Sequence, residues 1–264
     1  MPYVSKSNSA MRQKKIPGII SVRIDSSRLN KKCLLDFAGL SVLEHVIVRA
    51  QLGGIEPIVC TSNDKKDNPI VEIAKKLNIK YFRGPKANKI LRWYLCCKKF
   101  NLTKIHTIDA DDPFFDQHAI KKSFDMLYQK KCDLVLPSKT SRDGGASEGY
   151  SMTKNCLKKI INIGGRKMRS PHYDTEIIEG FIPDQKIKKY TFKGTNYEIP
   201  KARLTLDYIE DYNFLKIIAL KCGNFSSRKK INVFLKNNYN LLKINSKRSK
   251  DWMLKQKFFL ESII

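Results

Sequence analysis

The sequence predicts an α/β fold, a doubly wound and mainly parallel sheet with helices on both faces. Short apolar runs alternate with segments whose apolar residues recur at helical spacing, which is the pattern of such a sheet. The chain has 264 residues, of which 42% are hydrophobic, enough for one sizeable domain with a packed core. We expect a flexible basic tail over 1–15, the α/β domain over 16–224 and a basic helical extension over 225–264.

The alternation begins with an apolar run that predicts a buried strand over 16–22. A helix is expected over 41–52, because Leu43, Val46 and Ile47 fall on one helical face. The elements expected next are strand 55–62, helix 68–77, strand 79–82, helix 88–100, strand 104–108, helix 117–129 and strand 132–136. Glycines interrupt the pattern from 137 to about 203, and it resumes with a strand over 202–206 and a helix over 209–221.

A polar, cationic loop follows the first expected strand. It carries the cations Arg23, Arg28 and Lys32 and the hydroxyls of Ser26 and Ser27. Guanidinium groups can grip phosphate oxygens in bidentate fashion, and an ammonium group adds a point charge. Open α/β sheets also bind ligands at strand ends of this kind. We expect the loop to bind a triphosphate; the alternative is an ordinary solvated surface in a very basic chain.

Two groups of aspartates stand at the ends of expected strands. Asp109 and Asp111 belong to the first group, and Asp207 and Asp211 form the second. Crowded carboxylates are costly unless they share a cation, and Mg²⁺ takes oxygen ligands while leaving room for water and phosphate. The first group predicts a divalent ion; the alternative is an acidic turn in which Asp116 caps the next helix.

These segments together resemble the sugar nucleotidyltransferases that make CMP-sugars, the Kdo, acylneuraminate and spore-coat polysaccharide cytidylyltransferases. Segment 22–35 resembles A-R-x-x-S-T-R-L-P-G-K, with Asn30 and Lys31 in place of Pro-Gly. Asp111 lies in a segment similar to G-D-x-P, and 203–211 matches R-x-T-x-D-x-x-x-D.

Two intervening segments extend the likeness. Segment 60–70 is similar to A-T-S-x-x-x-x-D-x-x-I, and 81–94 is similar to F-x-G-x-x-x-D-x-L-x-R-Y, with Asn88 in place of the aspartate. The resemblance therefore covers roughly residues 16–222. It implies a Rossmann-like nucleotide-diphospho-sugar transferase fold of the GT-A type. It also implies a homodimer that activates an acidic sugar with CTP, for surface polysaccharide or glycan synthesis, and releases pyrophosphate.

The resemblance also implies roles for individual residues. Arg23, Arg28 and Lys32 would neutralise the departing phosphates, and Asp111 and Asp207 would hold the cofactor Mg²⁺. The other residues expected at the nucleotide are Ser26, Ser27, Thr61, Ser62 and Asp109, the last standing where Kdo-type enzymes carry a glutamine near the base.

The acceptor stays open at this point. The resemblance implies that 137–203 forms the acceptor lid and dimer contacts, but the polar residues there are expected to be satisfied loop residues: Glu148, His172, Asp174, Thr175 and Glu176. An acidic sugar, a phosphonate and a polyol phosphate are all compatible with the same donor site.

Composition bounds the remaining possibilities. A formal net charge of +26 favours anionic partners, and the basic C-terminal segment would suit a polyanion binder. Nucleic acid is nevertheless not expected as the partner, because it leaves the two carboxylate groups unexplained. The apolar residues beyond 224 are too many for a free polar tail, so we expect them to dock as helices on the domain or on a second subunit.

The cysteines and the apolar runs indicate the compartment. Seven cysteines without metal-ligand spacing favour reduced core thiols. The first fifteen residues lack the apolar core of a signal peptide, and no run approaches eighteen apolar residues. We therefore expect a cytoplasmic protein without a membrane span.

Overall fold

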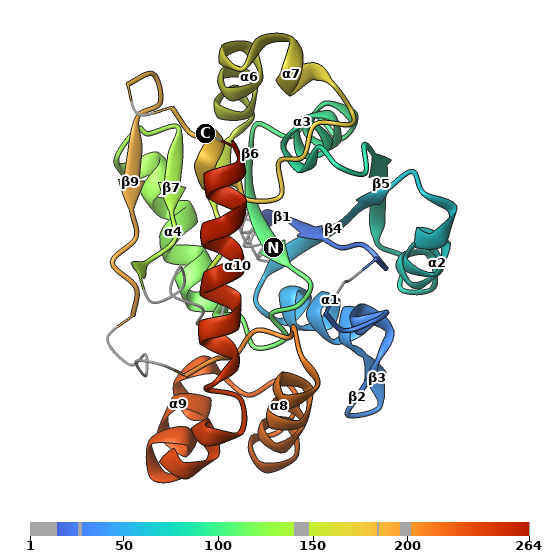
Figure 1. Cartoon of the computed structure of the whole chain (residues 1–264), viewed down its shortest axis with the longest axis vertical. Helices are drawn as coiled ribbons and strands as arrows, with labels where there is room; N and C mark the ends of the chain where they lie inside the picture. Colours follow the sequence, from blue (N-terminus) through green and yellow to red (C-terminus); the bar gives the residue numbers. More distant parts are fainter. Residues whose placement is uncertain (1–14, 26–27, 140–147, 184, 196–201, 264) are drawn as a thin grey trace, which may run out of the picture.

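The computed structural model describes residues 15–25, 28–139, 148–183, 185–195 and 202–263. The expected tail, apart from Lys15, lies outside the described residues, as do Ser26 and Ser27. Figure 1 shows a central sheet with helices packed on both of its faces.

The central sheet has seven strands among the described residues, and most neighbours are parallel. In spatial order they are β5 (Lys80–Gly84), β4 (Ile55–Ser62), β1 (Ile16–Ser21), β6 (Lys104–Asp109), β8 (Ser151–Thr153), β7 (Leu134–Leu136) and β9 (Lys189–Thr191). The first four strands run parallel, β8 is antiparallel to both of its neighbours, and β9 is parallel to β7. A separate hairpin joins β2 (Asp36–Phe37) to β3 (Leu40–Ser41). The predicted mainly parallel sheet is confirmed.

Successive residues of β1 divide the core into two layers. Ile19 packs with apolar side chains of α3 (Lys89–Lys99) and α6 (Lys154–Ile163), whereas Ile20 packs with those of α1 (Val42–Leu52) and α2 (Asn68–Lys76). Side chains alternate between the faces of a strand, so a strand that is apolar at consecutive positions must be covered on both faces. The doubly wound arrangement follows from this pattern. Among the described residues before 200, the remaining helices are α4 (Gln117–Gln129) and α7 (Gly165–Arg169), and the 3₁₀ turns are Lys32–Leu34, Lys65–Asp67 and Ile178–Phe181.

One expected strand is absent. Residues 202–206 have no regular structure, although Ala202, Leu204 and Leu206 alternate as a strand would. These three side chains are buried against α8 (Ile209–Cys222) and α9 (Arg228–Asn237) instead of in the sheet. The segment meets the 109–112 turn through one hydrogen bond, from Leu206 N to Asp111 O at 2.7 Å. The prediction was wrong because alternating burial does not require a neighbouring strand.

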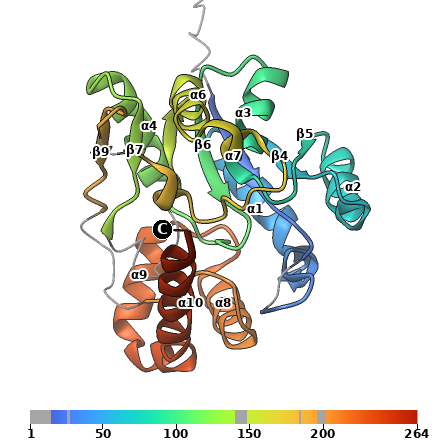
Figure 2. The same ribbon diagram turned by 45° about the horizontal axis from the view of Figure 1, so that its top comes forward.

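In the C-terminal extension, α9 lies beside α8 at one end of the molecule, and α10 runs from that end back toward the sheet (Figures 1 and 2). Ile231 and Leu235 of α9 and Leu242 of the 3₁₀ segment Tyr239–Ile244 are buried in the same apolar cluster as Phe37 and Leu204. These parts of the extension therefore dock on the α/β domain. The last helix, α10 (Arg248–Ile263), exposes Met253, Leu254 and Phe258.

Two expectations from composition can be compared with the structure. All seven cysteines are free and buried, which agrees with core thiols. Within the described ranges, no helix is long and apolar enough to cross a bilayer.

Candidate active site

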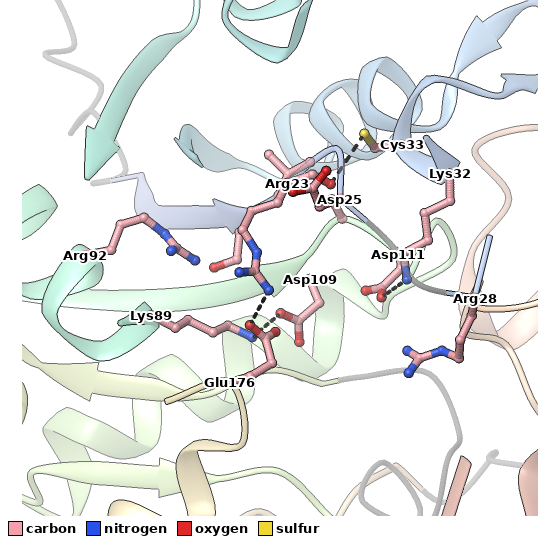
Figure 3. A pocket seen from close by; sticks show the side chains of 13 residues that line it. Arg23, Asp25, Arg28, Lys32, Cys33, Lys89, Arg92, Asp109, Asp111 and Glu176 are labelled. Carbon is pink, nitrogen blue, oxygen red and sulfur yellow. Dashed lines mark hydrogen bonds and ion pairs between the residues drawn. The ribbon is translucent and has the colours of Figure 1, made fainter. Parts of the chain in front are cut away.

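A cavity of about 250 Å³ opens at the carboxyl ends of β1 and β6. From this pair the sheet extends through β4 and β5 on one side and through β8 on the other. Open α/β sheets bind ligands at such a switch point, where the chain winds in two directions. The charged residues in the lining are Arg23, Asp25, Arg28, Lys32, Lys89, Arg92, Asp109, Asp111 and Glu176. Figure 3 shows two groups of them, one around Lys32 and one around Lys89.

The Lys32 group joins the cationic loop to two carboxylates, Asp111 in the turn after β6 and Asp207 in the segment before α8. Lys32 Nζ lies 2.6 Å from Asp111 Oδ2 and 2.8 Å from Asp207 Oδ1. It also donates to the Leu206 carbonyl at 2.9 Å, and Arg28 forms an ion pair with Asp207. The fold thus brings together four predicted site residues that come from three separate segments.

Burial and charge set the ionisation of this group. Burial opposes the charged form of Asp207, yet Lys32 and Arg28 hold its pKa well below the usual range. Burial raises the pKa of Asp111, and only Lys32 opposes that rise strongly. Burial also works against the charge of Lys32, but the two aspartates outweigh it and raise its pKa. Charged partners are therefore required to keep this group ionised.

The Lys89 group lies beside it in the cavity (Figure 3). Lys89 Nζ is 3.2 Å from Asp109 Oδ1 and 3.4 Å from Glu176 Oε1. Arg23 reaches the other oxygen of Glu176 at 2.9 Å. The charge of Lys89, together with that of Arg23, lowers the pKa of Glu176 to about 2. Two cations from different segments thus converge on one carboxylate.

A buried network supports Asp207 from below. Arg203 donates to Asp207 Oδ2 at 3.1 Å and to both oxygens of Asp211, and neither Arg203 nor Asp211 has an exposed side chain. Asp211 Oδ2 accepts from the backbone N–H groups of Asp207 and Tyr208 at 3.0 Å. The conformation at residue 207 is therefore fixed by its own backbone as well as by its side chain.

Asp67 ties the cationic loop to the end of β4. Its carboxylate accepts from Ile24 N at 2.8 Å, Thr61 Oγ1 at 2.9 Å and Ser62 N at 3.1 Å. Thr61 and Ser62 were expected to face the nucleoside, but both are fully buried and bonded to Asp67. Neither lines the cavity. Their hydroxyls are turned inward because a buried carboxylate needs donors.

A sequence model of cytidylyltransferases matches residues 18–168, which include the cationic loop, Lys89 and Asp111. The chain belongs to the cytidylyltransferase family. It is accordingly a nucleotidyltransferase, and the cavity at the ends of β1 and β6 is its candidate active site. Glu176 and Asp207 lie beyond the matched region.

The chain is also similar to individual proteins. A cytidylyltransferase from Leptospira borgpetersenii superposes with a TM-score of 0.75 at 26% identity, over 86% of this chain and 96% of that one. A CMP:2-keto-3-deoxy-manno-octonic acid synthetase complexed with CTP gives a TM-score of 0.60 at 13% identity, over 79% and 99% of the two chains, and shares the fold. An uncharacterized protein of Methanocaldococcus jannaschii is 29% identical over 201 residues, which are 75% of this chain and 80% of the relative.

The carboxylates of Asp111 and Asp207 are the residues of this cytidylyltransferase that could hold Mg²⁺. Within the described part of the chain, no cluster of three or more metal-ligating side chains occurs. Oxygens of Asp111 and Asp207 nevertheless converge on one cation, the ammonium of Lys32. Two carboxylate oxygens facing a common point suit an ion that keeps water or phosphate oxygens in its remaining positions. The donor set therefore fits Mg²⁺, provided that Lys32 turns toward another anion.

Several residues of the cavity were missed from the sequence. Lys89 and Arg92 belong to the segment 81–94, whose likeness to the family was recognised without assigning them a role. Glu176 was expected to be an ordinary loop residue, and its partners are 87 and 153 residues away along the chain. Asp109, expected near the base, does line the cavity and is paired with Lys89. Helical spacing could have placed Lys89 and Arg92 near each other, and the signal for Glu176 was its place in the segment expected to form the acceptor lid.

Proposed function

We propose that this cytidylyltransferase activates an acidic sugar, or a related anionic acceptor, with CTP and Mg²⁺, giving a CMP-conjugate and pyrophosphate. The supporting observation is a cavity whose cations come from two segments, the loop after β1 and α3, and lie next to the converging carboxylates of Asp111 and Asp207. One part of the cavity suits a triphosphate with its metal, and the Lys89 group suits a second anion.

The proposed reaction is attack of an acceptor oxygen on the α-phosphorus, with cleavage of its bond to the oxygen of the leaving pyrophosphate. Positioning and charge neutralisation dominate such a transfer. Arg28 and Lys32 would turn from the aspartates to the β- and γ-phosphates, assisted by Arg23. Asp111 and Asp207 would hold Mg²⁺, which when bound neutralises phosphate charge and orients the α-phosphate.

The Lys89 group supports an anionic acceptor. Lys89 and Arg23 both bind the carboxylate of Glu176 in this structure, so this part of the cavity accommodates a carboxylate. With Arg23 turned to the leaving phosphates, Lys89 would hold the acceptor carboxylate. A phosphonate or a polyol phosphate would meet the same lysine. A related fold, the 4-diphosphocytidyl-2C-methyl-D-erythritol synthase of Anaerococcus prevotii, has a TM-score of 0.51 at 18% identity, so the fold alone does not choose the acceptor.

The test is pyrophosphate release from CTP and the other nucleoside triphosphates, measured with a panel of keto-sugar acids, phosphonates and polyol phosphates. Each reaction is run with Mg²⁺ and with EDTA. Lys32→Ala serves as the site variant, and Lys80→Ala, whose exposed side chain pairs with Glu56, is its matched control. We expect release that depends on CTP, Mg²⁺ and a sugar acid, and that is lost only in the site variant. If pyrophosphate is released only with a phosphonate or polyol phosphate, the acceptor is not an acidic sugar. If no pyrophosphate is released and the protein is retained on heparin, a polyanion-binding function is favoured.

A further inference from the structure

We propose that Asn245, at the end of the 3₁₀ segment Tyr239–Ile244, is a positioning residue for Asp207, which makes the C-terminal extension part of the catalytic unit. The inference rests on the proposed function, because the role of Asp207 as a metal ligand belongs to that proposal. The proposal gives a functional role to a segment that lies beyond the residues matched by the family model.

Asn245 is bonded directly to the network beneath Asp207. Its Nδ2 donates to Asp211 Oδ1 at 2.9 Å and to the Arg203 carbonyl at 3.0 Å. Asn245 itself is only 1% exposed, so water does not readily replace these bonds. One side chain of the extension thus fixes both residues that fix Asp207.

The route from Asn245 to the carboxylate is short. Asp211 holds the backbone N–H of Asp207, while Arg203 holds Asp207 Oδ2. The opposite oxygen, Oδ1, is left to face Lys32 and Arg28 in the cavity. Loss of the Asn245 bonds would let Asp211 and Arg203 shift, and Asp207 Oδ1 would lose its fixed direction.

Two arginines of the extension contact the segments that carry the two carboxylates. Arg248 stacks on the Tyr208 ring, with its guanidinium carbon 4.9 Å from the centroid, and forms an ion pair with Glu210 at 2.8 Å. Arg228 of α9 donates to the Phe114 carbonyl at 2.9 Å, in the loop that follows Asp111. The extension therefore braces each of the two segments that would carry the metal ligands.

A purely structural role of the extension can be distinguished from positioning of Asp207 by comparing two variants in the same segment. Leu242 lies in the same 3₁₀ segment and is buried in the apolar cluster, but its side chain is aliphatic. Leu242→Ala should loosen the docking of the extension without removing a hydrogen bond from Asp211. Asn245→Leu keeps the branching at Cγ and removes both N–H donors.

The experiment compares the full-length parent, Asn245→Leu and Leu242→Ala. Mn²⁺ binding is measured by electron paramagnetic resonance in the presence of CTP and the absence of acceptor, and thermal midpoints are recorded alongside. The Mg²⁺ concentration for half-maximal pyrophosphate release is the second readout. Residues that orient metal ligands typically affect metal affinity by about 10- to 100-fold. We expect Asn245→Leu to weaken Mn²⁺ binding about tenfold and to raise the Mg²⁺ requirement, and Leu242→Ala to lower the thermal midpoint with near-parental metal constants.

Equal metal constants in the two variants would overturn the inference and leave the proposed function intact. A parent chain that binds no Mn²⁺ with CTP would overturn the proposed metal site, and the positioning role with it. If Asn245→Leu does not fold, Asn245→Ala takes its place under the same criteria.

Discussion

Lys32 Nζ lies 2.6 Å from Asp111 Oδ2, so the cationic loop after β1 is joined directly to the carboxylate turn after β6. Asp207 faces the same nitrogen from a third segment. Each of these charges would be costly to bury alone, and their pairing keeps all of them ionised. A triphosphate with its metal could exchange partners with this group without adding unpaired charge.

Removal of either proposed metal ligand should stop turnover. Asp111→Asn and Asp207→Asn each keep the side-chain shape and remove charge, and we expect kcat to fall by about 100- to 1000-fold, roughly 3 to 4 kcal/mol. Asp207→Asn should also lower the thermal midpoint, because Asp207 is 2% exposed and bonded to Arg203, whereas Asp111 is 27% exposed. Asp125→Asn, at an exposed position of α4, is the control. Parental turnover in either site variant would remove that residue from the metal role.

Loss of the loop cations should weaken binding and catalysis together. Arg28→Ala and Lys32→Ala would each remove a charge that contacts the leaving pyrophosphate in the proposed reaction, so kcat and CTP affinity should both fall. Calorimetry with CTP and steady-state rates measure the two effects, with Lys80→Ala as the exposed control. If both variants bind CTP and turn over like the parent, the loop does not hold the triphosphate.

Glu176 should contribute stability that depends on pH. Its ordinary pKa of 4.5 is lowered to about 2 in the folded chain, chiefly by Lys89. A depressed carboxyl pKa stabilises the fold above the unfolded value, and that stability is lost as pH falls from about 4.5 toward 2. The thermal midpoint of the parent should therefore exceed that of Glu176→Gln above pH 5, and the difference should disappear as the pH falls across this interval. Melting curves of the two proteins at matched pH test this, and a constant difference from pH 2 to 6 would contradict it.

Asp67 should stabilise the protein without touching the substrate. Its buried carboxylate accepts bonds from Ile24, Thr61 and Ser62. Removal of a charged acceptor leaves buried donors unsatisfied, so Asp67→Ala should lower the free energy of unfolding by about 3 kcal/mol. It should also weaken CTP binding by loosening the loop. Urea unfolding provides the measurement, and Glu72→Ala, exposed on α2, should behave like the parent. A loss no larger than that of the control would mean that the loop does not depend on Asp67.

The sequence by itself determined the parallel part of the sheet, β1, β4, β5 and β6, together with helices α1 to α4 and the charged segments that follow β1 and β6. Each depends on local information: apolar periodicity sets an element, and a polar run after it marks the strand end. β4 and α4 lie at the limits expected for them, 55–62 and 117–129. Parallel strands bring their carboxyl ends to one edge, so the sequence alone predicts that Arg28 and Asp111 lie near each other.

Only the tertiary structure decided which distant residues complete the site. Glu176 meets Lys89 across 87 residues, and Asn245 meets Asp211 across 34, in segments without a local pattern that marks them. Residues 202–206 alternate like a strand but form no strand pairing. Their apolar side chains are buried in the cluster beside α8 instead. Thr61 and Ser62 turned inward for the same kind of reason, since Asp67 required buried donors. These arrangements depend on which distant segments pack together. The patterns that can be recognised in one sequence are local and do not specify that packing.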